Sequence, residues 1–236
     1  MSRATELREA LRGRLIVSVQ AEAGSLLGEP ATIALLARCV VANGAAAVRI
    51  EGDERIRAVR AAVTVPIVGI IKRTHPGFAP YITSTLEEVR AVAEAGADIV
   101  AFDATARTRA GNASVADLIA AIHGHGLAAM ADCATLADGT KAGGAAADIV
   151  ATTLAGYTEE TAGQSLPALE LVKALAARHP YVVCEGGIGA PDDVCAAFAA
   201  GAAAVVVGTA ITNVDALTRR FAQAVPGANA PAARPT

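Results

Sequence analysis

Short apolar runs alternate with amphipathic stretches along almost the whole chain. Four runs rich in aliphatic residues cover residues 14–20, 65–71, 126–132 and 181–187. Four more lie in the similar segments 42–50, 94–102, 143–151 and 199–208, where a Gly follows a helical pattern and an apolar run begins within a few residues. The stretches between these strand candidates carry helical spacing, and TLEEVRAVAEAG begins with a Thr-x-x-Glu capping box at Ser84 or Thr85.

This pattern predicts eight strands that alternate with about eight helices. Strands that are apolar on both faces are typical of a parallel sheet covered on both sides, and eight such units in this length match a single-domain (β/α)8 TIM barrel. The alternative is an open doubly wound sheet, but no GxGxxG fingerprint follows the first strand candidate. We expect the barrel to span residues 1–225, and the Pro- and Ala-rich tail 226–236 to be disordered.

Composition and charge exclude several classes of partner. The core must be built from small aliphatic residues, because aromatic residues make up 3% of the chain and Trp is absent. A net charge of -3 with no basic block argues against nucleic acid and anionic membrane surfaces. The chain lacks both the apolar stretch of a signal peptide and a run of 18 apolar residues, so we expect a cytoplasmic protein.

No residue pattern indicates a metal site. The cysteines are far apart, form no CxxC pair and mostly lie in apolar runs, where they behave as small hydrophobic residues; they are Cys39, Cys133, Cys184 and Cys195. The four histidines show no HxxxH or HExxH spacing. We therefore expect no metal in the site.

Polar residues terminate the strand candidates, and in a barrel these carboxyl ends converge on one face where the chemistry lies. In strand order the terminating residues are Gln20; Arg49 and Glu51; Lys72 and Arg73; Asp103; Asp132; Thr152 and Thr153; Glu185; and Gly208 and Thr209. A strand that simply surfaces in water explains any one of them. Together they predict a ring of polar groups above an aliphatic barrel.

Lys72 and Glu185 end the third and seventh strand candidates, which stand diametrically opposite in a ring of eight. Two groups in this arrangement can remove a proton from one face of a carbon centre and return one to the other face. Burial and the neighbouring Arg73 and Arg49 would push Lys72 toward its neutral form, while an apolar pocket would favour protonated Glu185. A buried salt bridge between Lys72 and Glu185 is the alternative.

Glycine-rich segments follow the last two strand candidates. CEGGIGAPDD (184–193) and VVVGTAIT (205–212) place Gly186, Gly187 and Gly208 at the position where many barrel enzymes bind phosphate through backbone N–H groups. Plain turns are the alternative reading of the same glycines.

The segments GIIKR (69–73), FDATARTR (102–109) and TTLAGYT (152–158), in this order, carry a family resemblance. With SVQA, VRIEG, PYITSTLEEV, MADCATLADG and CEGGIGAPDD, they make the chain similar to the N-acylglucosamine-6-phosphate 2-epimerases, from about Gly13 to about Val225. The resemblance implies a TIM barrel isomerase that interconverts N-acetylmannosamine 6-phosphate and N-acetylglucosamine 6-phosphate in amino sugar and sialic acid catabolism. It also implies that no redox cofactor is needed.

The resemblance implies roles for individual residues. Its proton-transfer pair matches Lys72 and Glu185, and its substrate contacts match Gln20, Arg49 and Asp132, to which we add Arg73, Thr153 and Tyr157. The phosphate loops match Gly186, Gly187 and Gly208, followed by Thr209. The chain departs from the family at Asn213, where many members have Arg, at Thr74 and at Ala110.

Two other functions stay open at this point. Lys72 could form a Schiff base with a phosphorylated carbonyl compound, as in class I aldolases, or the protein could bind a sugar phosphate without catalysis. The missing Arg at Asn213 favours the second of these. Barrels of this size often form homodimers, and the sequence identifies no interface for one.

Overall fold

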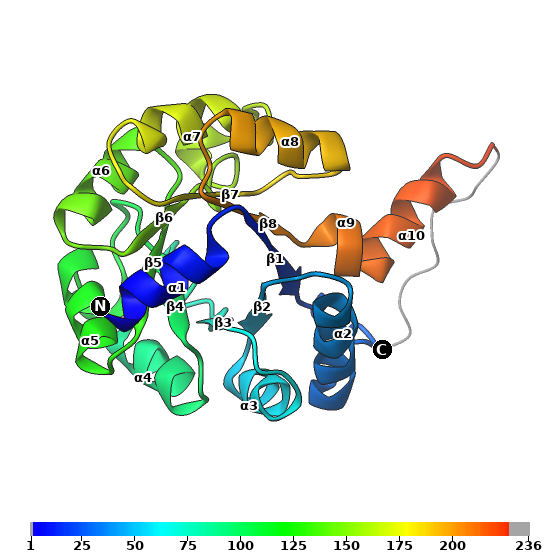
Figure 1. The fold of residues 1–236 in the computed structure, drawn as a ribbon, viewed down its shortest axis with the longest axis horizontal. Helices are drawn as coiled ribbons and strands as arrows, with labels where there is room; N and C mark the ends of the chain where they lie inside the picture. The colour runs from blue at the N-terminus through cyan, green and yellow to red at the C-terminus, as the bar shows by residue number, and fades with distance from the viewer. Residues whose placement is uncertain (1, 227–236) are drawn as a thin grey trace.

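The computed structural model describes residues 2–226, which form a closed barrel of eight parallel strands surrounded by helices (Figure 1). Each strand pairs with the next in sequence, and β8 closes the ring on β1. The predicted TIM barrel is therefore confirmed, and the doubly wound alternative is wrong. The tail predicted to be disordered lies, apart from Pro226, outside the described residues.

The elements follow the predicted alternation. The strands are β1 (Arg14–Val19), β2 (Ala47–Glu51), β3 (Ile67–Ile70), β4 (Ile99–Asp103), β5 (Ala128–Asp132), β6 (Ile149–Ala151), β7 (Val182–Glu185) and β8 (Ala204–Val207). The helices are α1 (Arg3–Leu11), α2 (Pro30–Ala42), α3 (Asp53–Ala62), α4 (Leu86–Glu94), α5 (Val115–Gly124), α6 (Leu136–Gly144), α7 (Leu169–Ala176), α8 (Pro191–Ala199), α9 (Thr209–Thr212) and α10 (Val214–Gln223), with short 3-10 helices η1 (Ala110–Asn112) and η2 (Glu159–Thr161). No helix among residues 2–226 is both long and apolar enough to cross a membrane.

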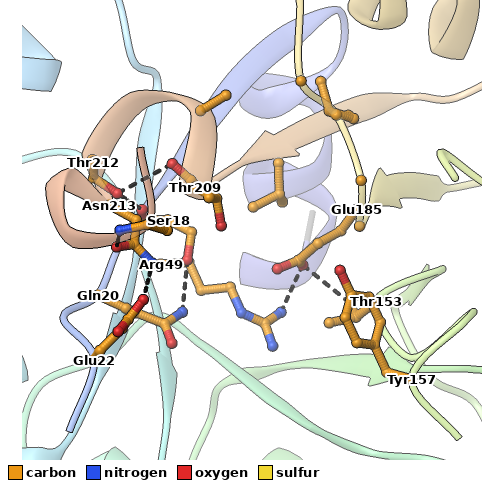
Figure 2. A pocket seen from close by; sticks show the side chains of 18 of the residues that line it. Ser18, Gln20, Glu22, Arg49, Thr153, Tyr157, Glu185, Thr209, Thr212 and Asn213 are labelled. Carbon is orange, nitrogen blue, oxygen red and sulfur yellow. Dashed lines mark hydrogen bonds and ion pairs between the residues drawn. The ribbon is translucent and has the colours of Figure 1, made fainter. Parts of the chain in front are cut away.

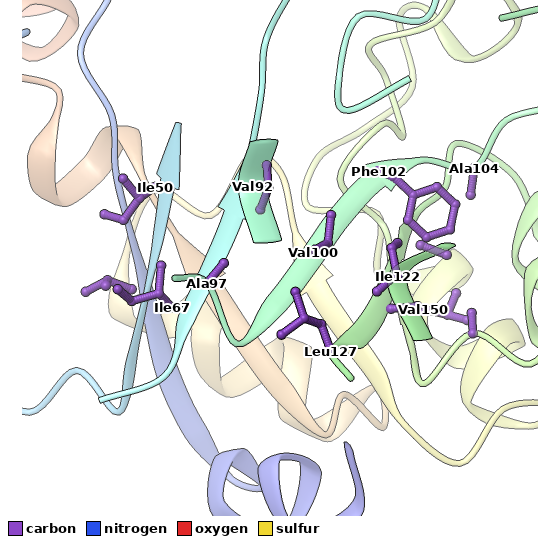
Figure 3. Packing of buried hydrophobic residues seen from close by; sticks show 14 of the residues in the cluster. Ile50, Ile67, Val92, Ala97, Val100, Phe102, Ala104, Ile122, Leu127 and Val150 are labelled. Atoms are coloured by element: carbon purple, nitrogen blue, oxygen red, sulfur yellow. The ribbon is translucent and has the colours of Figure 1, made fainter. Parts of the chain in front are cut away.

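Alternating strand residues build two apolar layers. Residues such as Ile16 and Met130 point into the barrel, and α1, which the sequence pattern did not predict, covers the amino-terminal end there with Leu11. Residues of the other parity, such as Val100 and Val150, pack between the strands and the outer helices (Figure 3). The strands are thus buried on both faces, as a parallel sheet requires.

The segment after β3 folds back on the strand and fixes the position of Lys72. Lys72 forms an isolated antiparallel bridge with Ile82, and the backbone N–H of Arg73 donates to the carbonyl of Tyr81 at 2.9 Å. The return ends at Thr85, whose side chain caps α4 and accepts from the N–H of Glu88 at 3.2 Å. The predicted capping box is present, and it holds this return in place.

Helix α10 differs from the other helices of the barrel. None of its residues is buried, and it extends away from the strands (Figure 1). Asn213 caps it by accepting from the N–H of Ala216 at 2.9 Å. Its exposed apolar side chains include Val214 and Phe221.

Gly69 provides a stability test of the contact between β3 and α4. A Cβ at this position would lie 2.5 Å from Val92 Cγ1 and 2.8 Å from Ala97 Cβ. We expect Gly69→Ala to lower the free energy of unfolding by about 1–3 kcal/mol because the core is overpacked there. Urea denaturation measures the change. Gly124→Ala is the matched control, since nothing lies within 4 Å of its Cβ position, and equal stabilities of the two variants would contradict the expectation.

Candidate active site

A cavity of about 610 Å³ opens at the carboxyl ends of the strands (Figure 2). The predicted site residues that line it are Gln20, Arg49, Lys72, Thr153, Tyr157, Glu185, Gly186, Gly187, Gly208 and Thr209. Residues from β1, β2 and the ends of β7 and β8 therefore meet in one space, together with Lys72 from the segment after β3. Part of the predicted ring of polar strand ends therefore lines a single cavity. The members of the ring that do not line it are Glu51, Arg73, Asp103, Asp132 and Thr152.

Arg49 is the buried centre of the site. Its side chain is 1% exposed, and its Nη2 and Nη1 donate to the two oxygens of Asp132 at 2.6 Å and 3.1 Å. Nη1 also donates to Glu185 Oε2 at 2.9 Å. Burial alone would lower the pKa of Arg49, but the charges of Asp132 and Glu185 outweigh it and raise the pKa. Asp132 thus lies beneath Arg49 and orients it.

Glu185 ends β7 with its carboxyl group in the cavity wall. Its backbone is fixed by Thr152, whose hydroxyl donates to the Glu185 carbonyl at 3.0 Å and accepts from the Glu185 N–H at 3.1 Å. Burial raises the pKa of Glu185 to about 7, against the opposing charge of Arg49. The protonated form predicted from the sequence is therefore accessible near neutral pH.

Lys72 lines the same cavity with its side chain open to solvent there. The surrounding protein still desolvates the amine, which is the main cause that lowers its pKa, followed by the charge of Arg49. The strand order places β3 and β7 four positions apart, so Lys72 and Glu185 enter from opposite sides. Among residues 2–226 no ion pair joins them; Glu185 pairs with Arg49 instead. The salt-bridge alternative is not what the structure shows.

Arg73 does not occupy the position that the sequence suggested. Its side chain is 56% exposed, and its Nε lies 3.9 Å from Glu88 Oε1, away from the cavity. Adjacent residues on an extended segment point in opposite directions, so the segment that brings Lys72 inward turns Arg73 outward. The cation that lowers the pKa of Lys72 is accordingly Arg49 rather than Arg73.

The glycines after β7 and β8 also line the cavity, and Gly186 directly follows Glu185 in the chain. Gly186 and Gly187 have φ values of 106° and 75°, a region that favours glycine. A Cβ on Gly187 would also lie 2.3 Å from Leu166 Cβ. The tight turn therefore explains why both positions require glycine. The two glycines also line the cavity, so a ligand in the cavity can reach their backbone.

The sequence analysis assigned no role to several residues that line the cavity, among them Tyr81, Glu22 and Arg220. Tyr81 lies in the return segment beside Lys72, and burial raises its pKa. Arg220 comes from α10, close to Ala216 and Leu217 of the same helix. The sequence shows that Arg220 follows the last strand candidate. It does not show that the helix carrying Arg220 reaches the cavity, so this residue was missed.

Glu22 and Asn213 form a small polar group next to α10. Asn213 donates to Glu22 Oε1 at 3.2 Å, and Arg219 Nη2 donates to that oxygen at 2.5 Å.

The side chain of Gln20 donates to Ser18 Oγ at 2.6 Å. Asp103, another polar strand end, is bound by Arg107 at 2.6 Å and does not line the cavity. Residues 2–226 contain no cluster of His, Cys, Asp and Glu suited to a metal ion.

The arrangement suits proton transfer. A lysine whose pKa is lowered and a glutamate whose pKa is raised can be base and acid at one pH, and they face the cavity from opposite sides. Arg49 places a fixed positive charge beside Glu185. A carbon acid bound in this cavity could lose a proton to one group and receive one from the other.

Comparisons with known proteins agree with this chemistry. The NanE family, described as "Putative N-acetylmannosamine-6-phosphate epimerase", matches residues 33–227. A protein of Thermosynechococcus vestitus named "Putative N-acetylmannosamine-6-phosphate 2-epimerase" is 45% identical over 93% of this chain and 96% of its own. A protein of Klebsiella pneumoniae with the same name is 44% identical over 98% and 99%.

A solved structure supports the same relationship. The structure of the N-acetylmannosamine-6-phosphate 2-epimerase from Clostridium perfringens superposes with a TM-score of 0.89 at 35% identity, covering 93% of this chain and 96% of that one. The chain therefore belongs to the NanE family of N-acetylmannosamine-6-phosphate epimerases.

Proposed function

We propose that this protein interconverts N-acetylmannosamine 6-phosphate and N-acetylglucosamine 6-phosphate by moving the proton at C2. The observation that carries the proposal is the pair Lys72 and Glu185, which enter one cavity from the ends of opposite strands. The two sugars differ only in configuration at C2. A group on each face of that carbon is therefore the arrangement that the reaction needs.

The reaction begins from the open-chain sugar, because the C1 aldehyde makes the C2 proton acidic. In one direction neutral Lys72 takes the proton from C2, and the electron pair moves into the C1 carbonyl to give an enolate. Protonated Glu185 then donates its proton to the opposite face of C2 as the carbonyl re-forms. The reverse direction uses ionised Glu185 as base and charged Lys72 as acid, so that atoms and charge balance in each.

Arg49 is placed to stabilise the negative charge that develops on the enolate oxygen. Its side chain lines the cavity, and Asp132 holds the guanidinium in place through two hydrogen bonds. A positive charge that is already fixed needs no rearrangement during the reaction.

The part of the cavity formed by the glycines and α10 suits the phosphate group. Gly186, Gly187 and Gly208 line it, and the exposed Arg220 of α10 adds a guanidinium. Arg49 is already paired with carboxylates and Lys72 is needed for proton transfer, so we assign the phosphate to Arg220. Arg220 would take the place of the arginine that many family members have at position 213, where this chain has Asn. The missing arginine is then a weaker argument for a protein that binds a sugar phosphate without catalysis.

The Schiff-base aldolase remains the second reading of Lys72, because a lowered lysine pKa also suits imine formation. Epimerisation needs one proton-transfer group on each face of a carbon, which the opposed positions of Lys72 and Glu185 supply, so the pair favours epimerisation. A homodimer and a cytoplasmic location stay predictions. Sedimentation velocity of the full chain would test the first of these.

Removal of the Lys72 amine should abolish proton exchange at C2. We expect Lys72→Ala to slow the loss of the C2 proton signal of N-acetylmannosamine 6-phosphate in deuterated buffer by about 10²–10⁴-fold, since it removes one general base. Proton NMR follows both the exchange and the gluco epimer. Lys141→Ala on α6, an exposed site outside the cavity, is the control. If the wild type exchanged no deuterium, the epimerase proposal would fail; a borohydride-trapped adduct at Lys72 would favour the aldolase.

Loss of the Arg220 charge should weaken binding of the phosphate group without slowing the chemistry. For Arg220→Gln we expect KM for N-acetylmannosamine 6-phosphate to rise about 10–100-fold with little change in kcat, because a hydrogen bond to a charged group is worth about 1.5–3 kcal/mol. The unphosphorylated sugar should show no such difference in steady-state assays. Arg90→Gln, an exposed arginine on α4, is the matched control. An unchanged KM would show that Arg220 does not bind phosphate.

A further inference from the structure

The Thr153 hydroxyl lies between the two carboxyl groups of the site. Its Oγ1 is 2.7 Å from Asp132 Oδ1 and 3.0 Å from Glu185 Oε2, and Figure 2 shows the second contact. A hydroxyl has one hydrogen and can donate to only one of these oxygens. If both carboxyl groups were ionised, the other would face the oxygen of Thr153 without a hydrogen between them.

The remaining contacts decide which carboxyl group takes the donated hydrogen. Asp132 accepts from both terminal nitrogens of Arg49, whereas Glu185 accepts from one. Negative charge is therefore better compensated on Asp132. The Thr153 contact is also shorter on that side, as expected for a hydroxyl that donates to a carboxylate.

We propose that Thr153 donates to Asp132 and accepts from Glu185, so that it holds Glu185 in its protonated, proton-donating form. Thr153 is then a positioning residue rather than the substrate contact that the sequence suggested, since its hydroxyl is already engaged on both sides. It acts through Glu185 and ties the protonation of that group to the Arg49–Asp132 pair. The catalytic part of this inference rests on the proposed function.

Burial in the cavity wall raises the pKa of Glu185, whereas a hydrogen bond donated by Thr153 to the ionised carboxylate would lower it. In the proposed arrangement the direction of that bond is reversed, because the single hydrogen of Thr153 goes to Asp132. The charged and titratable groups around Glu185 are Arg49 from β2, Asp132 from β5 and Lys72 after β3. All three stay in place when only the Thr153 hydroxyl is removed. The direction in which the pKa of Glu185 then changes shows whether that hydroxyl donated to Glu185 or accepted from it. An acceptor for the protonated form raises the pKa of a carboxyl group, and a donor to the ionised form lowers it.

The test is the pKa of Glu185 in Thr153→Val, which keeps the shape of the side chain and removes the hydroxyl. The probe is ¹³C NMR of side-chain carboxyl groups in the ligand-free protein, with the Glu185 signal assigned from Glu185→Gln. We expect the pKa to fall by about one unit from its wild-type value, because the protonated form loses its acceptor. Thr153→Ser, which restores the hydroxyl, should return it. Thr152→Val is the matched control, since the Thr152 hydroxyl bonds the backbone of Glu185 and not its carboxyl group.

Each outcome decides the point. A rise in the pKa would show that Thr153 donates to ionised Glu185, and an unchanged pKa would show a structural role alone; both overturn the proposal. The lower polarity of valine can only raise the pKa, so it cannot imitate the expected fall. This titration needs no activity and stays valid if the epimerase proposal fails. In the active enzyme, the fall of kcat/KM at high pH should move to lower pH in Thr153→Val alone.

Discussion

One guanidinium shared by two carboxyl groups organises this site. Arg49 is buried between Asp132 and Glu185, and each of the three comes from a different strand of the barrel. Burying such a group is costly unless every charge is paired, and breaking one pair costs about 3–5 kcal/mol. The strands must therefore hold fixed positions for the cluster to exist. Closure of the barrel supplies that rigidity, and Thr152 extends it to the backbone of Glu185.

The same cluster explains how a lysine and a glutamate can exchange roles. With Lys72 and Glu185 both charged, the four groups carry no net charge; with both neutral, Arg49 and Asp132 still cancel. The two arrangements thus differ in the number of charges in the site and not in their sum. Desolvation favours the neutral pair, as the lowered pKa of Lys72 and the raised pKa of Glu185 indicate. A proton can cross the cavity by way of substrate without leaving an uncompensated charge behind.

The sequence was sufficient for the strands and their polar ends, because a closed parallel barrel leaves a strong apolar pattern and gathers the carboxyl ends on one face. Lys72 and Glu185 could be selected from strand order alone. The sequence was not sufficient to predict which way the side chains point in the segments that follow the strands. Arg73 faces outward because the chain returns to pair Ile82 with Lys72, a contact that no local pattern encodes. Helix α1 and Arg220 were missed for a similar reason, since tertiary packing places them.

The charges that line the cavity are not all neutralised to the same degree. Arg49 is neutralised by carboxylates, and desolvation disfavours the charge of Lys72. Arg219 pairs with Glu22, while Arg220 of the same helix is exposed at the cavity wall. Under the proposed function, Arg220 would hold the phosphate while Arg49 and Lys72 act at the carbon that loses its proton. An arginine at position 213 is then not needed, and Asn213 instead caps the helix that carries Arg220.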